Sequence, residues 1–230
     1  GGLAANYSLA NGLGTGNITV ASLTITANND SKTYGQTKTY VAGSTTFTSS
    51  GLQNGETIGS VTMTASGGTT VASAVGNYTL TPSAAIGGTF TASNYSITYA
   101  TGTLTVNTAP LTITGITISN KAYDGTTNAT IAGTAAYSGL VNSESFSVTG
   151  TPTASFASSA VGTGIAVTVS GYTAPSSNYS ITQPSLIADI TTRALTINAL
   201  DTSRVYGTTL TAGSGSTRFT TSGLQNGETV

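Results

Sequence analysis

Gly51-Leu52-Gln53-Asn54-Gly55-Glu56-Thr57 occurs letter for letter a second time in this chain of 230 residues, at 223–229. A related stretch, Gly-Leu-Val-Asn-Ser-Glu-Ser, lies between the two copies at 139–145. The three stretches start 88 and then 84 residues apart, at positions 51, 139 and 223. Self-similarity at a nearly fixed spacing is the signature of a tandem repeat, so we interpret the chain as an array of similar units.

Two further markers share this register. The segment Asn-Tyr-Ser followed by Leu or Ile begins at Asn6, Asn94 and Asn178. A third marker places a cation two residues before a tyrosine: Lys32-Thr33-Tyr34-Gly35, Lys121-Ala122-Tyr123-Asp124-Gly125 and Arg204-Val205-Tyr206-Gly207.

The phase of the markers predicts the domain organisation. Residues 1–20 are expected to be the C-terminal tail of a preceding repeat, and 21–107 and 108–191 to be complete repeats. Residues 192–230 are expected to open a further repeat, which makes the chain a window of a longer protein. The linkers around Pro110 and Arg193 are short, so neighbouring repeats should bend little relative to each other.

Local patterns predict strands that face one core in each repeat. Apolar residues alternate with Thr at 23–26, 103–106 and 111–114, the period-two pattern of a half-buried strand. The segment 95–106 predicts an antiparallel hairpin. The Gly-Leu segment, the stretch that begins at Gly51, Gly139 and Gly223, could hold one short helical turn. The predicted fold class is all-β, a tandem array of small β-sandwich-like domains of about 85 residues, immunoglobulin-like or β-grasp-like in detail. The side chains expected in the core include Tyr95, Ile97, Leu104, Val106, Leu111, Ile113, Tyr179 and Ile181.

Composition excludes several function classes. Charged residues are 6% of the chain and the net charge is −1, which offers no basic surface for nucleic acid and no cationic face for anionic lipid. No apolar run approaches the length of a membrane helix, so no direct membrane insertion is expected. The chain has no Cys or His, which excludes triads built on those residues and most zinc and redox sites. Seven acidic residues are scattered over separate repeats, so neither a glycosidase carboxylate pair nor a cofactor or metal is predicted.

The motifs, in this order and register, resemble the MBG (YGX-type) and YDG repeats of large bacterial surface adhesins, including filamentous-haemagglutinin-type exoproteins. Tyr34-Gly35 and Tyr206-Gly207 are similar to the YGX type, and Tyr123-Asp124-Gly125 is similar to the YDG type. The resemblance covers essentially the whole chain. It implies an extracellular, β-rich module strung in arrays, without catalysis and without a defined ligand. A bacterial exterior also agrees with the lack of Cys.

Each repeat carries one recurring cation and one recurring anion. We expect Lys32 to lie near Glu56 and Lys121 near Glu144, as ion pairs that orient loops. The alternative is an isopeptide bond from lysine to a carboxyl or amide group, which intact mass would reveal as a loss of water or ammonia. Arg204 favours the ion pair, because a guanidinium is not the amine that such a bond uses.

The predicted function is a non-catalytic stalk or adhesive array of a large exported bacterial surface protein, with neighbouring repeats of the same chain as partners. The alternative is a repeat that itself binds glycan or host matrix through exposed aromatics, for which Tyr7, Tyr95 and Tyr179 are candidates. A spacer should instead bury its aromatic side chains. The residues predicted as structural repeat markers are Lys32, Tyr34, Gly35, Glu56, Tyr95, Lys121, Tyr123, Asp124, Gly125, Glu144, Tyr179, Arg204, Tyr206 and Glu228.

Overall fold

A computed structural model of the chain describes residues 14–211 and 213–230. Two compact units divide the chain, Gly1–Asn107 and Thr108–Val230. The described residues form β-strands and, at Ala92–Asn94, one turn of 3-10 helix (η2). The predicted all-β array of sandwich-like domains is confirmed. Most of the predicted tail at 1–20, including Tyr7, lies outside the described residues.

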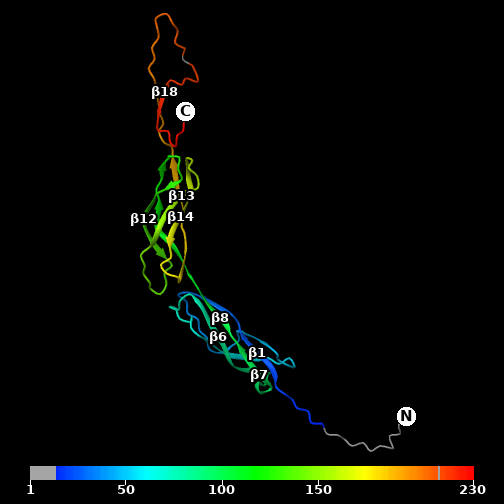
Figure 1. The fold of residues 1–230 in the computed structure, drawn as a ribbon. Helices are drawn as coiled ribbons and strands as arrows, with labels where there is room; N and C mark the ends of the chain where they lie inside the picture. The colour runs from blue at the N-terminus through cyan, green and yellow to red at the C-terminus, as the bar shows by residue number, and fades with distance from the viewer. Residues whose placement is uncertain (1–13, 212) are drawn as a thin grey trace, which may run out of the picture. The chain divides into compact units, whose positions relative to one another are not determined.

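The first unit consists of a three-stranded and a five-stranded sheet. Its strands are β1 (Ala21–Ala27), β2 (Asp30–Thr33), β3 (Ala42–Ser44), β4 (Phe47–Ser50), β5 (Ile58–Ala65), β6 (Gly76–Gly88), β7 (Tyr95–Ala100) and β8 (Gly102–Asn107). The sheet orders are β4-β1-β7 and β2-β8-β6-β5-β3. Figure 1 shows β1 beside β7, which run parallel, and β6 beside β8, which run antiparallel.

The second unit repeats this topology strand for strand. Its strands are β9 (Ala109–Ile118), β10 (Lys121–Ala122), β11 (Asn128–Ala129), β12 (Ile131–Ser138), β13 (Thr149–Phe156), β14 (Gly162–Thr173), β15 (Tyr179–Thr182) and β16 (Ser185–Thr191). The sheet orders are β12-β9-β15 and β10-β16-β14-β13-β11. The same unit also contains the antiparallel pair β17 (Thr196–Ala199) and β18 (Phe219–Ser222).

Strand register is also repeated. The pairing of the first strand with the strand before the Gly-Leu segment joins a threonine to a serine each time. These pairs are Thr24 with Ser50, Thr112 with Ser138, and Thr196 with Ser222. The β17–β18 pair therefore matches β1–β4 residue for residue, at an offset of 172 positions on both strands.

In each complete unit the chain passes directly from the small sheet to the large one after its first strand and again after its seventh. β1 and its parallel partner β7 lie in the small sheet, whereas β2 and its parallel partner β8 lie in the large one. At this crossing the Thr103 amide donates to Asn29 Oδ1 at 2.9 Å. The predicted antiparallel hairpin over Tyr95–Val106 is wrong, because its two strands enter different sheets and pair with other partners.

The cores follow the predicted alternation. In β1, Leu23 and Ile25 are buried while Thr24 faces outward. Predictions of burial are confirmed for six residues: Tyr95, Leu104, Val106, Leu111, Ile113 and Tyr179. Ile97 and Ile181 are only partly buried, and pack at the edges of their core clusters. Because a separate buried cluster fills each unit, each unit has its own hydrophobic core.

Candidate functional site

A tyrosine–glutamate clamp fixes the Gly-Leu segment in both complete units. In the first, the buried Tyr95 donates its hydroxyl to Glu56 Oε2 and accepts the Gln53 amide at 2.9 Å. In the second, Tyr179 donates to Glu144 Oε2 and accepts the Val141 amide at 3.1 Å. The hydrogen bond to Glu56 raises the pKa of the Tyr95 hydroxyl, since ionisation would place two anions together.

The segment held by the clamp is a tight turn. In each copy the glutamate amide donates to the carbonyl three residues earlier, at 2.9 to 3.0 Å. Both central residues have positive φ, as in Asn54 (53°) and Gly55 (70°). These features define a type I′ turn. The suggested helical turn in this segment is therefore wrong, because an Asn-Gly pair readily adopts the left-handed region.

The turn at 33–36, which follows β2 in the first unit, encloses the ammonium of Lys32, and we call it the cation loop. Lys32 is 5% exposed, and its ammonium donates to the Gln36 carbonyl at 2.7 Å and to the Thr70 carbonyl. Burial lowers the pKa of this ammonium. Between Thr33 and Gln36 the chain makes a hydrogen-bonded turn with Gly35 at a φ of 88°, so the Tyr-Gly pair forms the turn that wraps the amine.

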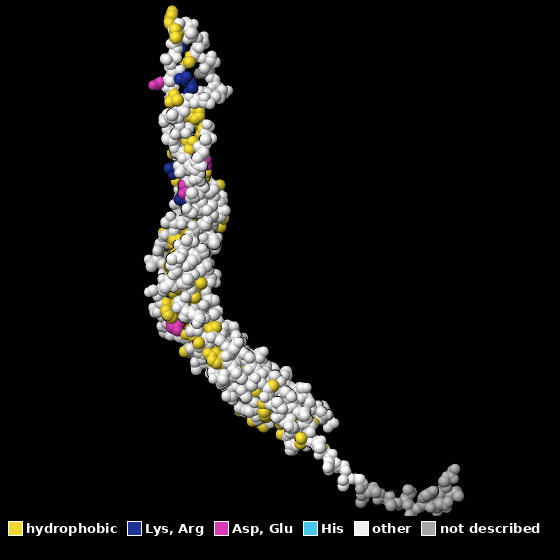
Figure 2. Space-filling model, in the orientation of Figure 1, with side chains coloured by type: hydrophobic (Ala, Val, Ile, Leu, Met, Phe, Trp, Pro, Cys, Tyr) yellow, Lys and Arg dark blue, Asp and Glu magenta, His cyan; other side chains and the backbone are white. Residues whose placement is uncertain are grey.

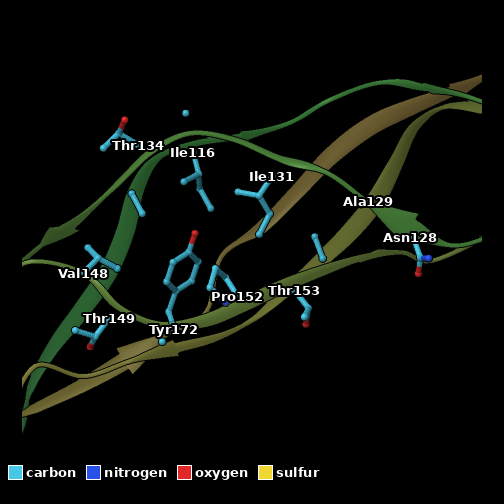
Figure 3. A pocket seen from close by; sticks show the side chains of 14 residues that line it. Ile116, Asn128, Ala129, Ile131, Thr134, Val148, Thr149, Pro152, Thr153 and Tyr172 are labelled. Atoms are coloured by element: carbon cyan, nitrogen blue, oxygen red, sulfur yellow. The ribbon is translucent and has the colours of Figure 1, made fainter.

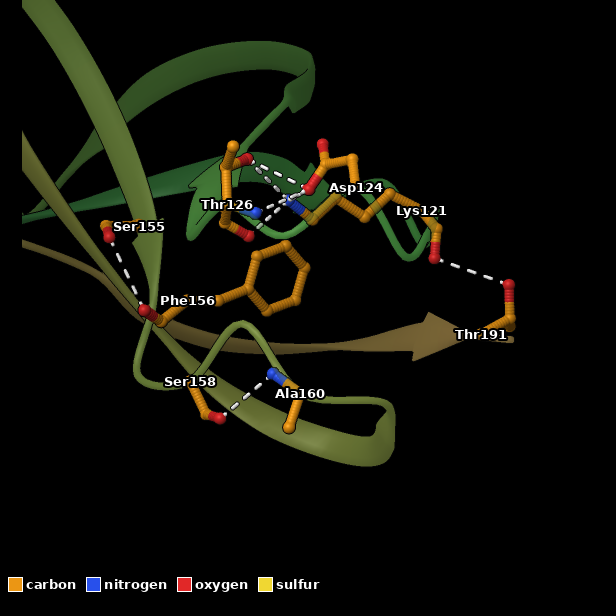
Figure 4. Close-up of polar contacts among 8 residues, drawn as sticks. All are labelled: Lys121, Asp124, Thr126, Ser155, Phe156, Ser158, Ala160 and Thr191. Carbon is orange, nitrogen blue, oxygen red and sulfur yellow. Dashed lines mark hydrogen bonds and ion pairs between the residues drawn. The ribbon is translucent and has the colours of Figure 1, made fainter. Parts of the chain in front are cut away.

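The cation loop of the second unit, at 121–126, encloses Lys121 with different groups (Figure 4). Lys121 Nζ lies 2.8 Å from Asp124 Oδ1 and 2.7 Å from the Thr126 carbonyl, and it sits 5.4 Å from the centroid of the Phe156 ring. Asp124 Oδ1 also accepts the Thr126 amide at 2.9 Å. The Lys121 hydrogen bond is the main cause that lowers the pKa of Asp124 to about 2. In the incomplete repeat the exposed Arg204 donates to the Thr208 carbonyl.

The predicted pairing of recurring charges is wrong. Lys32 binds two carbonyls and Glu56 binds Tyr95, so this cation and anion belong to different clusters. Lys121 forms its ion pair with Asp124, three residues away, and not with Glu144. Each lysine donates to a carbonyl four or five residues ahead and to at least one further acceptor, so the turn glutamate is available for the tyrosine.

Two protein families match this chain. The model of the MBG domain (YGX type) matches residues 23–105, and the model of the YDG domain matches residues 107–186. The chain carries an MBG domain followed by a YDG domain. Both are repeat domains of surface-type proteins, and neither is a known catalytic family. No curated protein and no solved structure matches the chain.

Sequence reasoning missed one polar cluster of the MBG domain. Lys38 Nζ pairs with Asp30 at 2.7 Å, and the Tyr40 hydroxyl donates to the same carboxylate at 3.0 Å. The signal was the alternation of Lys38 and Tyr40, which places both side chains on one face of an extended segment. The described residues contain no group of three or more acidic side chains that could hold a metal ion.

The YDG domain has an open groove beside β12 and β13, shown in Figure 3. Its volume is about 840 Å³. Ile116, Ile131, Val148, Pro152 and Tyr172 line it, together with threonines and backbone. Because no charged side chain is among the lining residues, the groove offers apolar contact and neutral hydrogen bonds.

The third position of the turn is a serine in the YDG domain and a glycine in the other two copies, which leads to a prediction. Ser143 has a φ of 58°, where the MBG domain has Gly55. The left-handed region costs a non-glycine residue about 1 to 2 kcal/mol, and Gly loses about 0.5 to 1 kcal/mol more on ordering. Ser143→Gly is therefore expected to stabilise the YDG domain by about 0.5 to 1 kcal/mol in urea denaturation. Gly55→Ser, in open space, is the reciprocal control and should destabilise the MBG domain. A destabilised Ser143→Gly variant would contradict this account.

The cation loop of the YDG domain predicts acid sensitivity. The unfolded carboxyl of Asp124 has a pKa of about 3.9, whereas the folded one has a pKa of about 2. A depressed carboxyl pKa contributes stability above the unfolded value, and this stability is lost as the pH falls through the folded value. We expect the Asp124→Asn variant to lose less stability than the wild type between about pH 4 and 2. Titration of the Asp124 side-chain carbon by NMR checks the cause, and a midpoint near 4 would refute it.

Proposed function

We propose that this MBG–YDG chain is a non-catalytic spacer in the repeat region of a large exported bacterial surface protein. The observation that carries the proposal is the repetition itself: two units with one topology, one strand register and one separate core each. Such units add length without adding a new site. The family matches support the setting, since these domains occur as repeats of surface-type proteins.

The placement of aromatic side chains favours a spacer over a binding repeat. Tyr34, Tyr95, Phe156, Tyr172 and Tyr179 are buried. Among the described residues, the exposed large aromatics are Phe146 and Tyr206, which belong to different repeats. Charged side chains are sparse on the face drawn in Figure 2. A glycan-binding surface normally gathers exposed aromatics, and the described surface has no such pair in one repeat.

No helix within residues 14–211 and 213–230 has the length and hydrophobicity required to cross a bilayer. The proposed location outside a bacterial cell rests on the family setting.

Small-angle X-ray scattering of the 230-residue chain tests the spacer proposal. A single globule of this length has a radius of gyration of about 17 Å. Domains arranged end to end should give a value well above that, with the profile of an elongated particle. A compact profile near about 17 Å would contradict the spacer.

The alternative function is direct ligand binding, and the groove of the YDG domain is the observation that favours it. Binding of the chain to an array of immobilised glycans tests it. Tyr172→Phe and Val148→Ala, which alter the groove lining, should abolish a specific signal, whereas Val71→Ala in the MBG domain should not. Absence of binding to any glycan would leave the spacer as the supported function.

A further inference from the structure

We propose that the Tyr-Asp-Gly loop of the YDG domain is a docking surface for the turn of the repeat that follows it. The Tyr123 hydroxyl donates to Oε1 of Glu228, which lies 105 residues further along the chain. Glu228 closes the Asn-Gly-Glu turn of the repeat that begins after residue 191. The contact therefore joins two marker motifs that belong to successive repeats. This proposal goes beyond the spacer function, because a contact between successive repeats does not depend on which function the array serves.

A second contact supports the same docking. Gly125 has a φ of 73°, and a Cβ built on it would lie 2.1 Å from Asn226 Nδ2 and 3.3 Å from Asn226 Cβ. The equivalent Gly207, at a φ of 83°, has nothing within 4 Å of such a Cβ. Both glycines thus serve a turn, but only Gly125 also makes room for a neighbouring side chain. The backbone of the loop at Gly125 therefore lies against the Asn226 side chain, in addition to the contact made by the Tyr123 hydroxyl.

The two oxygens of the turn glutamate separate its two roles. Within a complete unit, Oε2 receives the hydroxyl of the unit's own tyrosine, as in Glu56 with Tyr95 and Glu144 with Tyr179. In the docking contact, Oε1 of Glu228 receives the hydroxyl of the preceding repeat. A carboxylate can accept at both oxygens at once. One acid can therefore hold its own turn and bind the loop of its neighbour, which explains why a charge-poor chain keeps a glutamate at this position.

The partner of this surface is defined by its chemistry. It must present a type I′ turn whose second residue is a small polar side chain and whose fourth is a carboxylate, as in Gln225-Asn226-Gly227-Glu228. Residues 21–107, 108–191 and 192–230 each carry both halves in their sequence, a loop with tyrosine and glycine and a turn ending in Glu. The hydrogen bond to Glu228 also raises the pKa of Tyr123, which gives a spectroscopic marker of docking.

Engineered disulfides test the contact in this Cys-free chain. Disulfides form where two Cβ atoms lie about 3.5 to 4.5 Å apart, and the 3.3 Å between a Cβ on Gly125 and Asn226 Cβ is just below this range, so a small shift of the exposed turn suffices. The double variant Gly125→Cys with Asn226→Cys is expected to oxidise under air to an intramolecular disulfide. Gly207→Cys with Asn226→Cys is the matched control and should keep free thiols, since Gly207 has no neighbour within 4 Å of a Cβ. Equal oxidation of the two variants, or of neither, would overturn the proposal.

Titration of Tyr123 in the otherwise unaltered chain gives an independent test that needs no cysteine. With tyrosine labelled at Cζ, NMR should report a Tyr123 pKa above the ordinary value of about 10. Glu228→Gln should return the pKa of Tyr123 toward that value, whereas Glu144→Gln, which changes the partner of Tyr179, should leave it raised. The same Tyr123 pKa in wild type and in Glu228→Gln would show that the loop and the turn do not dock.

Discussion

Tyr95→Ala is expected to lower the free energy of unfolding of the MBG domain by about 3 to 5 kcal/mol, as aromatic-to-Ala changes in cores do. The side chain is 7% exposed and its ring centroid lies 6.3 Å from that of Phe90. Its hydroxyl also holds Glu56 and the Gln53 amide, so truncation leaves a cavity and releases the turn. Urea denaturation of the whole chain, followed by amide exchange in β1 and β7, measures this domain separately.

Two variants separate the contributions of the ring and the hydroxyl. Tyr95→Phe keeps the ring but leaves the Gln53 amide and the Glu56 carboxylate without their shared partner, which should cost about 1 to 3 kcal/mol. Tyr206→Ala removes a fully exposed tyrosine and should change stability by no more than about 0.5 kcal/mol. An unchanged denaturation midpoint in Tyr95→Ala would show that this tyrosine is not a core residue and would revive its candidacy for a glycan groove.

Much of the fold could be predicted because the repeats and the strand alternation are local signals. Leu104 and Leu111 were expected in the core from a period of two, and both are fully buried. The same signal could not predict the sheet switch between β7 and β8. Alternation indicates which face of a strand is buried, but it does not indicate which sheet the strand joins. Two strands joined by a short turn have the same alternation whether they pair in one sheet or enter two facing sheets. The turn at Thr101 was therefore wrongly predicted to close an antiparallel hairpin.

The recurring charges were predicted to pair with each other, and the structure gives them other partners. Lys32, Glu56 and Tyr95 were singled out as structural repeat markers because they recur in register. Formal charge then suggested that cation and anion meet. In a chain with few charges, backbone carbonyls and tyrosine hydroxyls greatly outnumber carboxylates. Lys32 accordingly donates to two carbonyls, that of Gln36 in its own loop and that of Thr70. The sequence does not indicate whether a buried amine binds a backbone carbonyl or a carboxylate.

Gly51→Ala is expected to destabilise the MBG domain by about 3 kcal/mol, for two reasons that can be separated. Gly51 has a φ of 107°, and a Cβ on it would lie 2.2 Å from the Ser22 carbonyl oxygen in the adjacent strand. A left-handed non-glycine residue costs about 1 to 2 kcal/mol, and forcing a methyl group against fixed backbone costs about 1 to 3 kcal/mol. The neighbouring strand cannot move away without breaking the β1–β4 pairing, since Thr24 pairs with Ser50 next to this contact.

Gly43→Ala is the matched control, because Gly43 has a φ of 88° but open space around a Cβ. It should show the conformational cost alone, about 1 to 2 kcal/mol, and the difference between the two variants measures the contact. Gly139 and Gly223, at φ values of 106° and 108°, approach the carbonyls of Pro110 and Ala194 in the same way. If Gly51→Ala and Gly43→Ala cost the same in urea denaturation, the close approach has no energetic weight. The recurrence of this glycine would then follow from its φ alone.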